Sequence, residues 1–166
     1  MAGKDDILKY TIPQLLRWRV DKTGDKVALR EKEFGYWNNY TWNDFYDRVR
    51  KVALGLEQIG LKKDDKLALI GDNIPEMLFV AIGAQSIGAI SAGIYHTSLP
   101  DEIAELINYM DVTVVFCDDQ EQVDKLVEIR EQIPQVHKVI YEDPRGMRCL
   151  LYTSDAADEC CGVGGG

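Results

Sequence analysis

Acidic side chains that could bind a cation follow two predicted strands of this sequence. Asp72 comes soon after the apolar run 67–70, and Asp118 and Asp119 follow the run 114–117. Ligands of open α/β sheets bind outside the carboxyl ends of the strands, and clustered carboxylates there could hold Mg²⁺. The simpler interpretation is that Asp72 and Asp118 accept hydrogen bonds from loop amides while Asp119 caps a helix. We prefer it, because caps explain two of the positions without a metal and no lysine clearly completes a phosphate site.

Two histidines and one cysteine are the other groups of possible chemical use. His96 follows a predicted strand and His137 lies beside a predicted turn. His96 has no nucleophile near it in the sequence, and a single histidine does not make a metal site. We therefore expect both histidines to be solvent-facing loop residues. Cys117 follows apolar residues, which predicts a buried, unreactive thiol.

A glycine-rich phosphate cradle is absent from the sequence. Neither G-x-G-x-x-G nor G-x-x-x-x-G-K-[ST] occurs. The segment 88–93, GAISAG, begins a predicted strand and so lacks the helix N-terminal amides that bind phosphate. We interpret Gly88 as a helix stop and Gly93 as a point of close packing. No catalytic, cofactor-binding or metal-binding residue is therefore predicted.

The segment 66–95 is the βαβ unit that would position these residues. Residues 67–70 predict a short strand, and residues 77–87 are apolar on every side, which predicts a helix buried over most of its circumference. Asn73 is the predicted N-cap, with Pro75 in the first turn. A helix of this kind between two apolar strands is typical of a parallel sheet.

The same alternation extends to both sides of this unit. The further predicted elements are, in order, a helix capped by Thr11, a hairpin of strands 26–30 and 36–40, a helix capped by Thr41 and ended by Gly60, a helix capped by Ser98 and running through Met110, a strand over 112–116, a helix capped by Asp119 and closed by Pro134, and a strand over 138–141. This order is typical of the α/β class, with a doubly wound, mostly parallel sheet flanked by helices.

Composition predicts one folded, cytoplasmic domain. The chain has 166 residues, of which 46% are hydrophobic and 28% charged, enough to bury a core. No run approaches the roughly 20 apolar residues needed to cross a bilayer, and the first ten residues do not predict a signal peptide. The net charge of −9 disfavours nucleic acid as a partner.

Residues 149–166 differ from the rest of the sequence. They carry Cys149, Cys160 and Cys161 but no Lys or Arg, and the run CLLYTSDAADE resembles the in-frame translation of a sequencing adapter. We therefore expect 149–166 to be a non-native, disordered tail and 1–148 to be the genuine domain segment. No metal is predicted at Cys160 and Cys161, since no histidine is near. The single remaining cysteine fits a reducing compartment.

Five ordered segments span residues 11 to about 148. They are TIPQLLRWR, YTWNDFYDRVRKVALGLEQIGLKKDDKLALIGDN, PEMLFVAIGAQSIGAISAGIYHTS, LPDEIAELINYMDVTVVFCDDQEQVDKLVEI and HKVIYEDPRG. In order and spacing they resemble the N-terminal segment of long-chain fatty-acid acyl-CoA synthetases, in the adenylate-forming, AMP-binding superfamily. Such enzymes join a fatty acid to ATP as an acyl-adenylate and then pass the acyl group to coenzyme A. The resemblance implies a fatty acid, ATP, Mg²⁺ and CoA for the parent enzyme, and leaves membrane association of the parent open.

The motifs that carry the chemistry of that family do not occur here. They are a Ser/Thr/Gly-rich phosphate loop ending in Pro-Lys-Gly, an adenine-binding aromatic-Gly segment, an acidic ribose contact and a lysine of a small C-terminal domain. The resemblance therefore implies an incomplete part of the large N-terminal domain that binds no cofactor, lacks the C-terminal remainder and is inactive alone. Tyr95, His96 and Thr97 follow a strand in a well-matched segment, and we hypothesise that they approach a ligand in the whole enzyme.

Two other interpretations stay open. One is a receiver-like Mg²⁺-binding signalling domain built on Asp72, Asp118 and Asp119. The other is a non-catalytic α/β scaffold fragment. The truncation that the resemblance implies should expose the apolar patches meant to pack on the missing remainder, together with an open sheet edge, which predicts poor solubility.

Overall fold

A four-stranded parallel sheet forms the centre of the molecule, in a computed structural model that describes residues 9–143 and 145. Its strands are β3 (Lys66–Gly71), β4 (Ile90–Tyr95), β5 (Val114–Cys117) and β6 (Lys138–Tyr141). They lie in the order β4-β3-β5-β6, and every neighbouring pair is parallel. The prediction of an α/β fold with a doubly wound parallel sheet is confirmed.

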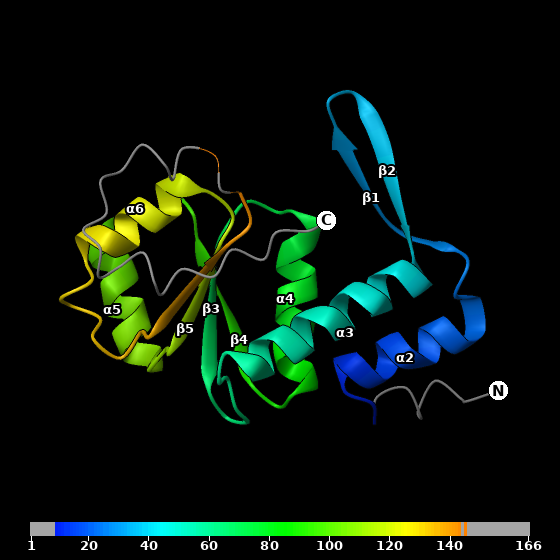
Figure 1. Cartoon of the computed structure of the whole chain (residues 1–166), viewed down its shortest axis with the longest axis horizontal. Coiled ribbons are helices and arrows are strands. Elements are labelled where there is room, and N and C mark those ends of the chain that lie inside the picture. The colour runs from blue at the N-terminus through cyan, green and yellow to red at the C-terminus, as the bar shows by residue number, and fades with distance from the viewer. Residues whose placement is uncertain (1–8, 144, 146–166) are drawn as a thin grey trace.

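Helices cover both faces of this sheet. The described helices are α2 (Ile12–Thr23), α3 (Trp42–Gln58), α4 (Pro75–Ser86), α5 (Pro100–Met110) and α6 (Gln120–Glu128), of which α2 packs against α3 and α4 instead of the sheet. Figure 1 shows α3 and α4 on one side of the sheet and α5 and α6 on the other. None of the helices in the described residues is both long and apolar enough to cross a membrane.

The central strand β3 shows why its sequence is an unbroken apolar run. Leu67 and Leu69 join the hydrophobic cluster of α3 and α4, whereas Ala68 and Ile70 join the cluster of α5 and α6. All four side chains are at most 6% exposed. Successive side chains of a strand point to opposite faces, so a strand covered on both sides needs apolar residues at every position.

Two predicted helix starts are wrong by one residue, for the same reason. The N-caps are Ile74 and Leu99 rather than Asn73 and Ser98. In both helices proline occupies the first helical position, which suits its fixed φ and its missing N–H. Proline also keeps the preceding residue extended, and that residue is then the cap whatever its side chain.

Other predicted boundaries also shift. β5 begins at Val114 rather than at residue 112, and α6 ends at Glu128, well before Pro134. The helix α4 is mostly buried or half-buried as predicted, but Leu78 is 40% exposed. Gly88 follows α4 with φ +86°, as expected of a helix stop. Gly93 is exposed, and a Cβ added to it would meet no atom within 4 Å, so the prediction of close packing there is wrong.

A separate antiparallel hairpin precedes the parallel sheet. It consists of β1 (Val27–Glu33) and β2 (Tyr36–Thr41), and it stands apart from the sheet at the upper right of Figure 1. Phe79 of α4 anchors its root, with ring centroids 5.9 Å from Tyr40 of β2 and 5.3 Å from Phe45 of α3. The predicted cap of α3 is confirmed at Thr41.

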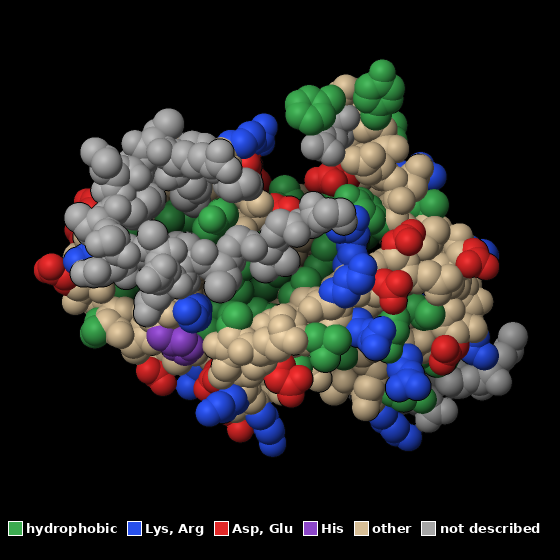
Figure 2. Space-filling view, viewed as in Figure 1, with side chains coloured by type: hydrophobic (Ala, Val, Ile, Leu, Met, Phe, Trp, Pro, Cys, Tyr) green, Lys and Arg blue, Asp and Glu red, His purple; other side chains and the backbone are tan. Residues whose placement is uncertain are grey.

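The tip of the hairpin is an uncovered aromatic surface. Phe34, Tyr36 and Trp37 are 85%, 79% and 61% exposed. Figure 2 shows hydrophobic side chains gathered at this tip, away from the body of the molecule. The expected exposure of apolar surface is present here.

Candidate functional site

The carboxyl ends of β3, β4 and β5 form the candidate site. The chain passes from β3 to β4 on one side and then crosses back to place β5 on the other side of β3. Ligands of open α/β sheets bind at such a switch point, outside the carboxyl ends of the strands. Asp72, His96 and Asp118 each directly follow one of these strands.

Side chains connect the three strand ends to one another. Oδ2 of Asp118 accepts a hydrogen bond from the backbone N–H of Asp72 at 2.6 Å. Oδ1 of Asp72 lies 3.3 Å from Nδ1 of His96, an ion pair when the imidazole is protonated. These contacts link β5 to β3 and β3 to β4.

The helix α6 completes a closed set of contacts. Nζ of Lys125 donates to the backbone oxygen of His96 at 2.5 Å and to Oε1 of Gln122 at 3.2 Å. Oδ1 of Asp119 accepts from the N–H of Gln122 at 3.2 Å, which confirms Asp119 as the helix cap. We call these six residues the switch-point ring: Asp72, His96, Asp118, Asp119, Gln122 and Lys125.

Asp118 has one enclosed carboxylate oxygen. Its Oδ1 is buried and has no hydrogen-bond partner among the described residues. Burial raises the pKa of this carboxyl above its ordinary value, and the hydrogen bond from Asp72 opposes that rise. A Cβ on Gly71 would overlap Cγ of Asp118 and lie 2.7 Å from its Oδ1, so the carboxylate occupies the space that the glycine leaves.

The ring brings the three predicted acidic residues together as internal partners. Asp118 accepts from a loop amide and Asp119 caps α6, as the simpler interpretation held, whereas the carboxylate of Asp72 contacts His96 instead of a loop amide. Within the described part of the chain, no group of three His, Cys, Asp or Glu side chains is placed to hold a metal ion. The arrangement does not fit a nucleotide phosphate either, because the ammonium of Lys125 already contacts three oxygens and the amide of Asp72 donates to the carboxylate of Asp118.

The other predicted residues have simpler environments. His137 is exposed as expected, but His96 is half-buried and paired rather than free in solvent. Cys117 is fully buried, as predicted. Tyr95 and Thr97 are exposed on either side of His96. The tail 149–166, with its three cysteines, lies outside the described residues.

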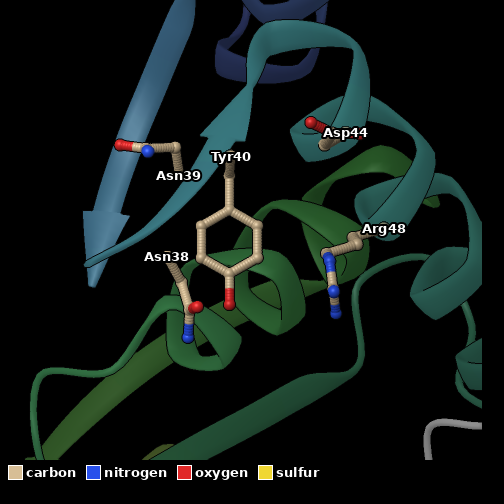
Figure 3. Close-up of a pocket in the computed structure, with 5 residues that line it drawn as sticks. All are labelled: Asn38, Asn39, Tyr40, Asp44 and Arg48. Carbon is tan, nitrogen blue, oxygen red and sulfur yellow. The ribbon is translucent and has the colours of Figure 1, made fainter. Parts of the chain in front are cut away.

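Apart from the switch-point ring, a hollow lies between the hairpin and α3, and the sequence did not point to it. It has a volume of about 460 Å³ and is lined by Asn38, Asn39, Tyr40, Asp44 and Arg48. In Figure 3 the phenol of Tyr40 and the guanidinium of Arg48 extend in the same direction, with Cζ of Arg48 5.1 Å from the ring centroid.

The phenol of Tyr40 in this hollow is hydrogen-bonded to another side chain of the hairpin. The hydroxyl of Tyr40 donates to Oε2 of Glu31 at 3.1 Å. Burial, with the Glu31 contact, raises the pKa of Tyr40 to about 12. Hydrogen bonds from Thr41 lower the pKa of Asp44. No group here is poised for proton transfer near neutral pH, and no residue that sequence analysis singled out lies in the hollow.

The chain is similar to curated ligases over most of its length. It is 33% identical over 138 residues to long-chain-fatty-acid–CoA ligase ACSBG1 of Homo sapiens, a match covering 82% of this chain and 19% of that protein. It is 28% identical over 134 residues to long-chain-fatty-acid–CoA ligase heimdall of Drosophila melanogaster, covering 78% and 20%. The chain thus spans about 19% of the length of such relatives.

Solved structures share the fold. An anthranilate CoA ligase, AuaEII, in complex with anthranoyl-AMP matches with a TM-score of 0.71 at 18% identity, over 80% of this chain and 25% of that one. A putative long-chain-fatty-acid CoA ligase of Rhodopseudomonas palustris CGA009 matches with a TM-score of 0.71 at 22% identity, over 81% and 33%.

The family match separates the ligase interpretation from the receiver-like one. The family described as AMP-binding enzyme matches residues 16–160, which includes the whole parallel sheet and extends beyond residue 148. A receiver-like signalling domain is not favoured by any of these similarities. The chain belongs to the AMP-binding enzyme family.

Proposed function

We propose that this chain is the N-terminal part of an ATP-dependent long-chain fatty acid–CoA ligase. The observation that carries the proposal is the 33% identity, over 82% of the chain, to a protein named as such a ligase. The parent enzyme joins the carboxylate of a fatty acid to ATP, releasing pyrophosphate, and the thiol of CoA then displaces AMP. Fatty acid, ATP, Mg²⁺ and CoA are its substrates and cofactors.

The contribution of this segment is structural. The carboxyl ends of its strands are occupied by the switch-point ring, and none of its described residues forms a phosphate cradle. Binding and activation of ATP therefore require the remainder of the parent chain. The proposal includes residues 1–148 as the genuine segment, 149–166 as a non-native tail, and a cytoplasmic parent that acts in fatty acid metabolism.

Pyrophosphate exchange tests the proposal directly. The complete enzyme, expressed from the contiguous gene that encodes residues 1–148, should show fatty-acid-dependent ATP–pyrophosphate exchange, and the 166-residue chain should show none. Clear exchange by the chain alone would overturn the proposal that this segment is inactive without the remainder of the parent chain. Absence of exchange by the complete enzyme with every long-chain acid tried would overturn the ligase assignment.

The contiguous DNA after the codon for Arg148 provides an independent check. A downstream phosphate-loop sequence would support the parent ligase, whereas a natural stop codon at that point would instead favour a non-catalytic scaffold.

A further inference from the structure

We infer that Lys125 is a positioning residue for the loop after β4, and that this loop faces the acyl chain of the fatty acid in the complete enzyme. The inference rests on the proposed function and deepens it. The loop, residues 95–99, runs from the end of β4 to the start of α5.

The ammonium group of Lys125 is held as a clamp. Its three N–H donors face three acceptors, namely the backbone oxygen of His96 at 2.5 Å, Oε1 of Gln122 at 3.2 Å and Oε1 of Glu121 at 3.1 Å. The Lys125 side chain is only 17% exposed. A largely enclosed ammonium is costly unless its donors are satisfied, so a packing role alone would be served better by an apolar side chain.

The loop needs such support because β4 is at the edge of the parallel sheet. β4 pairs with β3 alone among the described strands, so no second strand fixes its carboxyl end. Lys125 holds the backbone of His96, and Asp72 contacts its imidazole. Inside the loop, the N–H of Ser98 donates to the backbone oxygen of Tyr95 at 3.0 Å. A loop fixed in this way is suited to orient exposed side chains.

The exposed side chains of the loop suit an apolar ligand. Tyr95 is 83% exposed and Leu99 65% exposed, at the edge of the sheet where ligands of α/β folds bind. Neighbouring carboxylates, Asp72 and Asp118, repel the phosphates of ATP and CoA. The uncharged acyl chain is the part of the substrates that this surface can accept.

Kinetics of the complete enzyme test the inference. Lys125→Met should raise the KM for the fatty acid about tenfold, with kcat and the KM values for ATP and CoA changed less than twofold. Tyr95→Ser should likewise raise only the KM for the fatty acid. Lys125→Arg should leave that KM close to the wild-type value. The matched control is Lys66→Met, which removes an ion pair with Asp111 (3.5 Å) at the amino end of the same sheet.

Hydrogen exchange of the 166-residue chain separates this inference from the proposed function. Lys125→Met should speed exchange of the Ser98 amide at least tenfold relative to Lys66→Met, whether or not the parent is a ligase. Unchanged exchange in Lys125→Met would overturn the positioning role. If exchange rises but the fatty acid KM stays within twofold of wild type in both Lys125→Met and Tyr95→Ser, the acyl-facing role is overturned. If Lys125→Met does not fold, the KM of Tyr95→Ser tests the acyl-facing role. Hydrogen exchange in Lys125→Gln then tests the positioning role.

Discussion

Gly71→Ala tests whether the switch-point ring contributes to stability. A Cβ at this position would overlap Cγ of Asp118 and lie 2.7 Å from its Oδ1, far inside ordinary contact distance. The carboxylate of Asp118 must move by about 1 Å, because the added Cβ is fixed to the backbone at the end of β3 and cannot move away. Movement on that scale breaks the 2.6 Å hydrogen bond from the N–H of Asp72. Overpacking and the lost charged hydrogen bond together predict a loss of about 2–4 kcal/mol in the free energy of unfolding.

Urea unfolding of the 166-residue chain measures this loss. Gly55→Ala is the matched control, because Gly55 lies within α3 and a Cβ there would meet no atom within 4 Å. That variant should be more stable than wild type by about 0.5–1 kcal/mol, the ordinary gain of alanine over glycine in a helix. The two substitutions are chemically identical and should have effects of opposite sign.

A double-mutant cycle identifies the cause of the loss. Asp118→Gly removes the atoms that a Cβ on Gly71 would strike, so Gly71→Ala should cost at least about 1 kcal/mol less in that background than in wild type, the coupling typical of residues in contact. Equal costs in the two backgrounds would refute the reasoning. So would a Gly71→Ala variant within about 0.5 kcal/mol of wild type.

Three further predictions concern the same chain. Burial raises the pKa values of Asp118 and Glu142, so the folded state takes up protons before the unfolded chain as the pH falls. These two groups should therefore contribute stability as the pH falls through their raised folded-state pKa values, and urea titrations of the double variant Asp118→Asn, Glu142→Gln should lack this contribution. Phe79→Ala, at 2% exposed, should cost about 3–5 kcal/mol, whereas the adjacent Leu78→Ala, at 40% exposed, should cost less than about 1 kcal/mol; equal thermal shifts would contradict the packing described. Trp37→Ser at the aromatic hairpin tip should reduce self-association in light scattering, and a monodisperse monomer of the unaltered chain would contradict the expected poor solubility.

The parallel sheet could be predicted from sequence because its pattern is local. An apolar run such as residues 67–70 between helical segments indicates a strand buried on both faces, and the structure buries all four side chains. Capping by Thr41 and Asp119 is also local, because the partner lies three residues away. The predictions of Asn73 and Ser98 as caps are wrong because the following proline constrains the backbone more strongly than the side-chain preference of a cap.

The ring could not be predicted in the same way, because its contacts join distant parts of the chain. Asp72 and Asp118 are 46 residues apart, and His96 and Lys125 are 29 apart. Only the strand order makes them neighbours. No local pattern explains Gly71, since the reason for a glycine there is a carboxylate that arrives from another strand.

The ring also explains why a fold suited to nucleotides has no phosphate site at this switch point. In nucleotide-binding sheets a glycine after the first strand lets the backbone approach a phosphate. Here Gly71 leaves its space to the carboxylate of Asp118, and the Asp72 amide that could face a phosphate donates to that carboxylate instead. A phosphate at this position would have to displace a buried negative charge. Phosphate binding in the proposed parent must therefore come from residues beyond this segment, and the ring leaves the loop after β4 as the part of this edge that can meet a substrate.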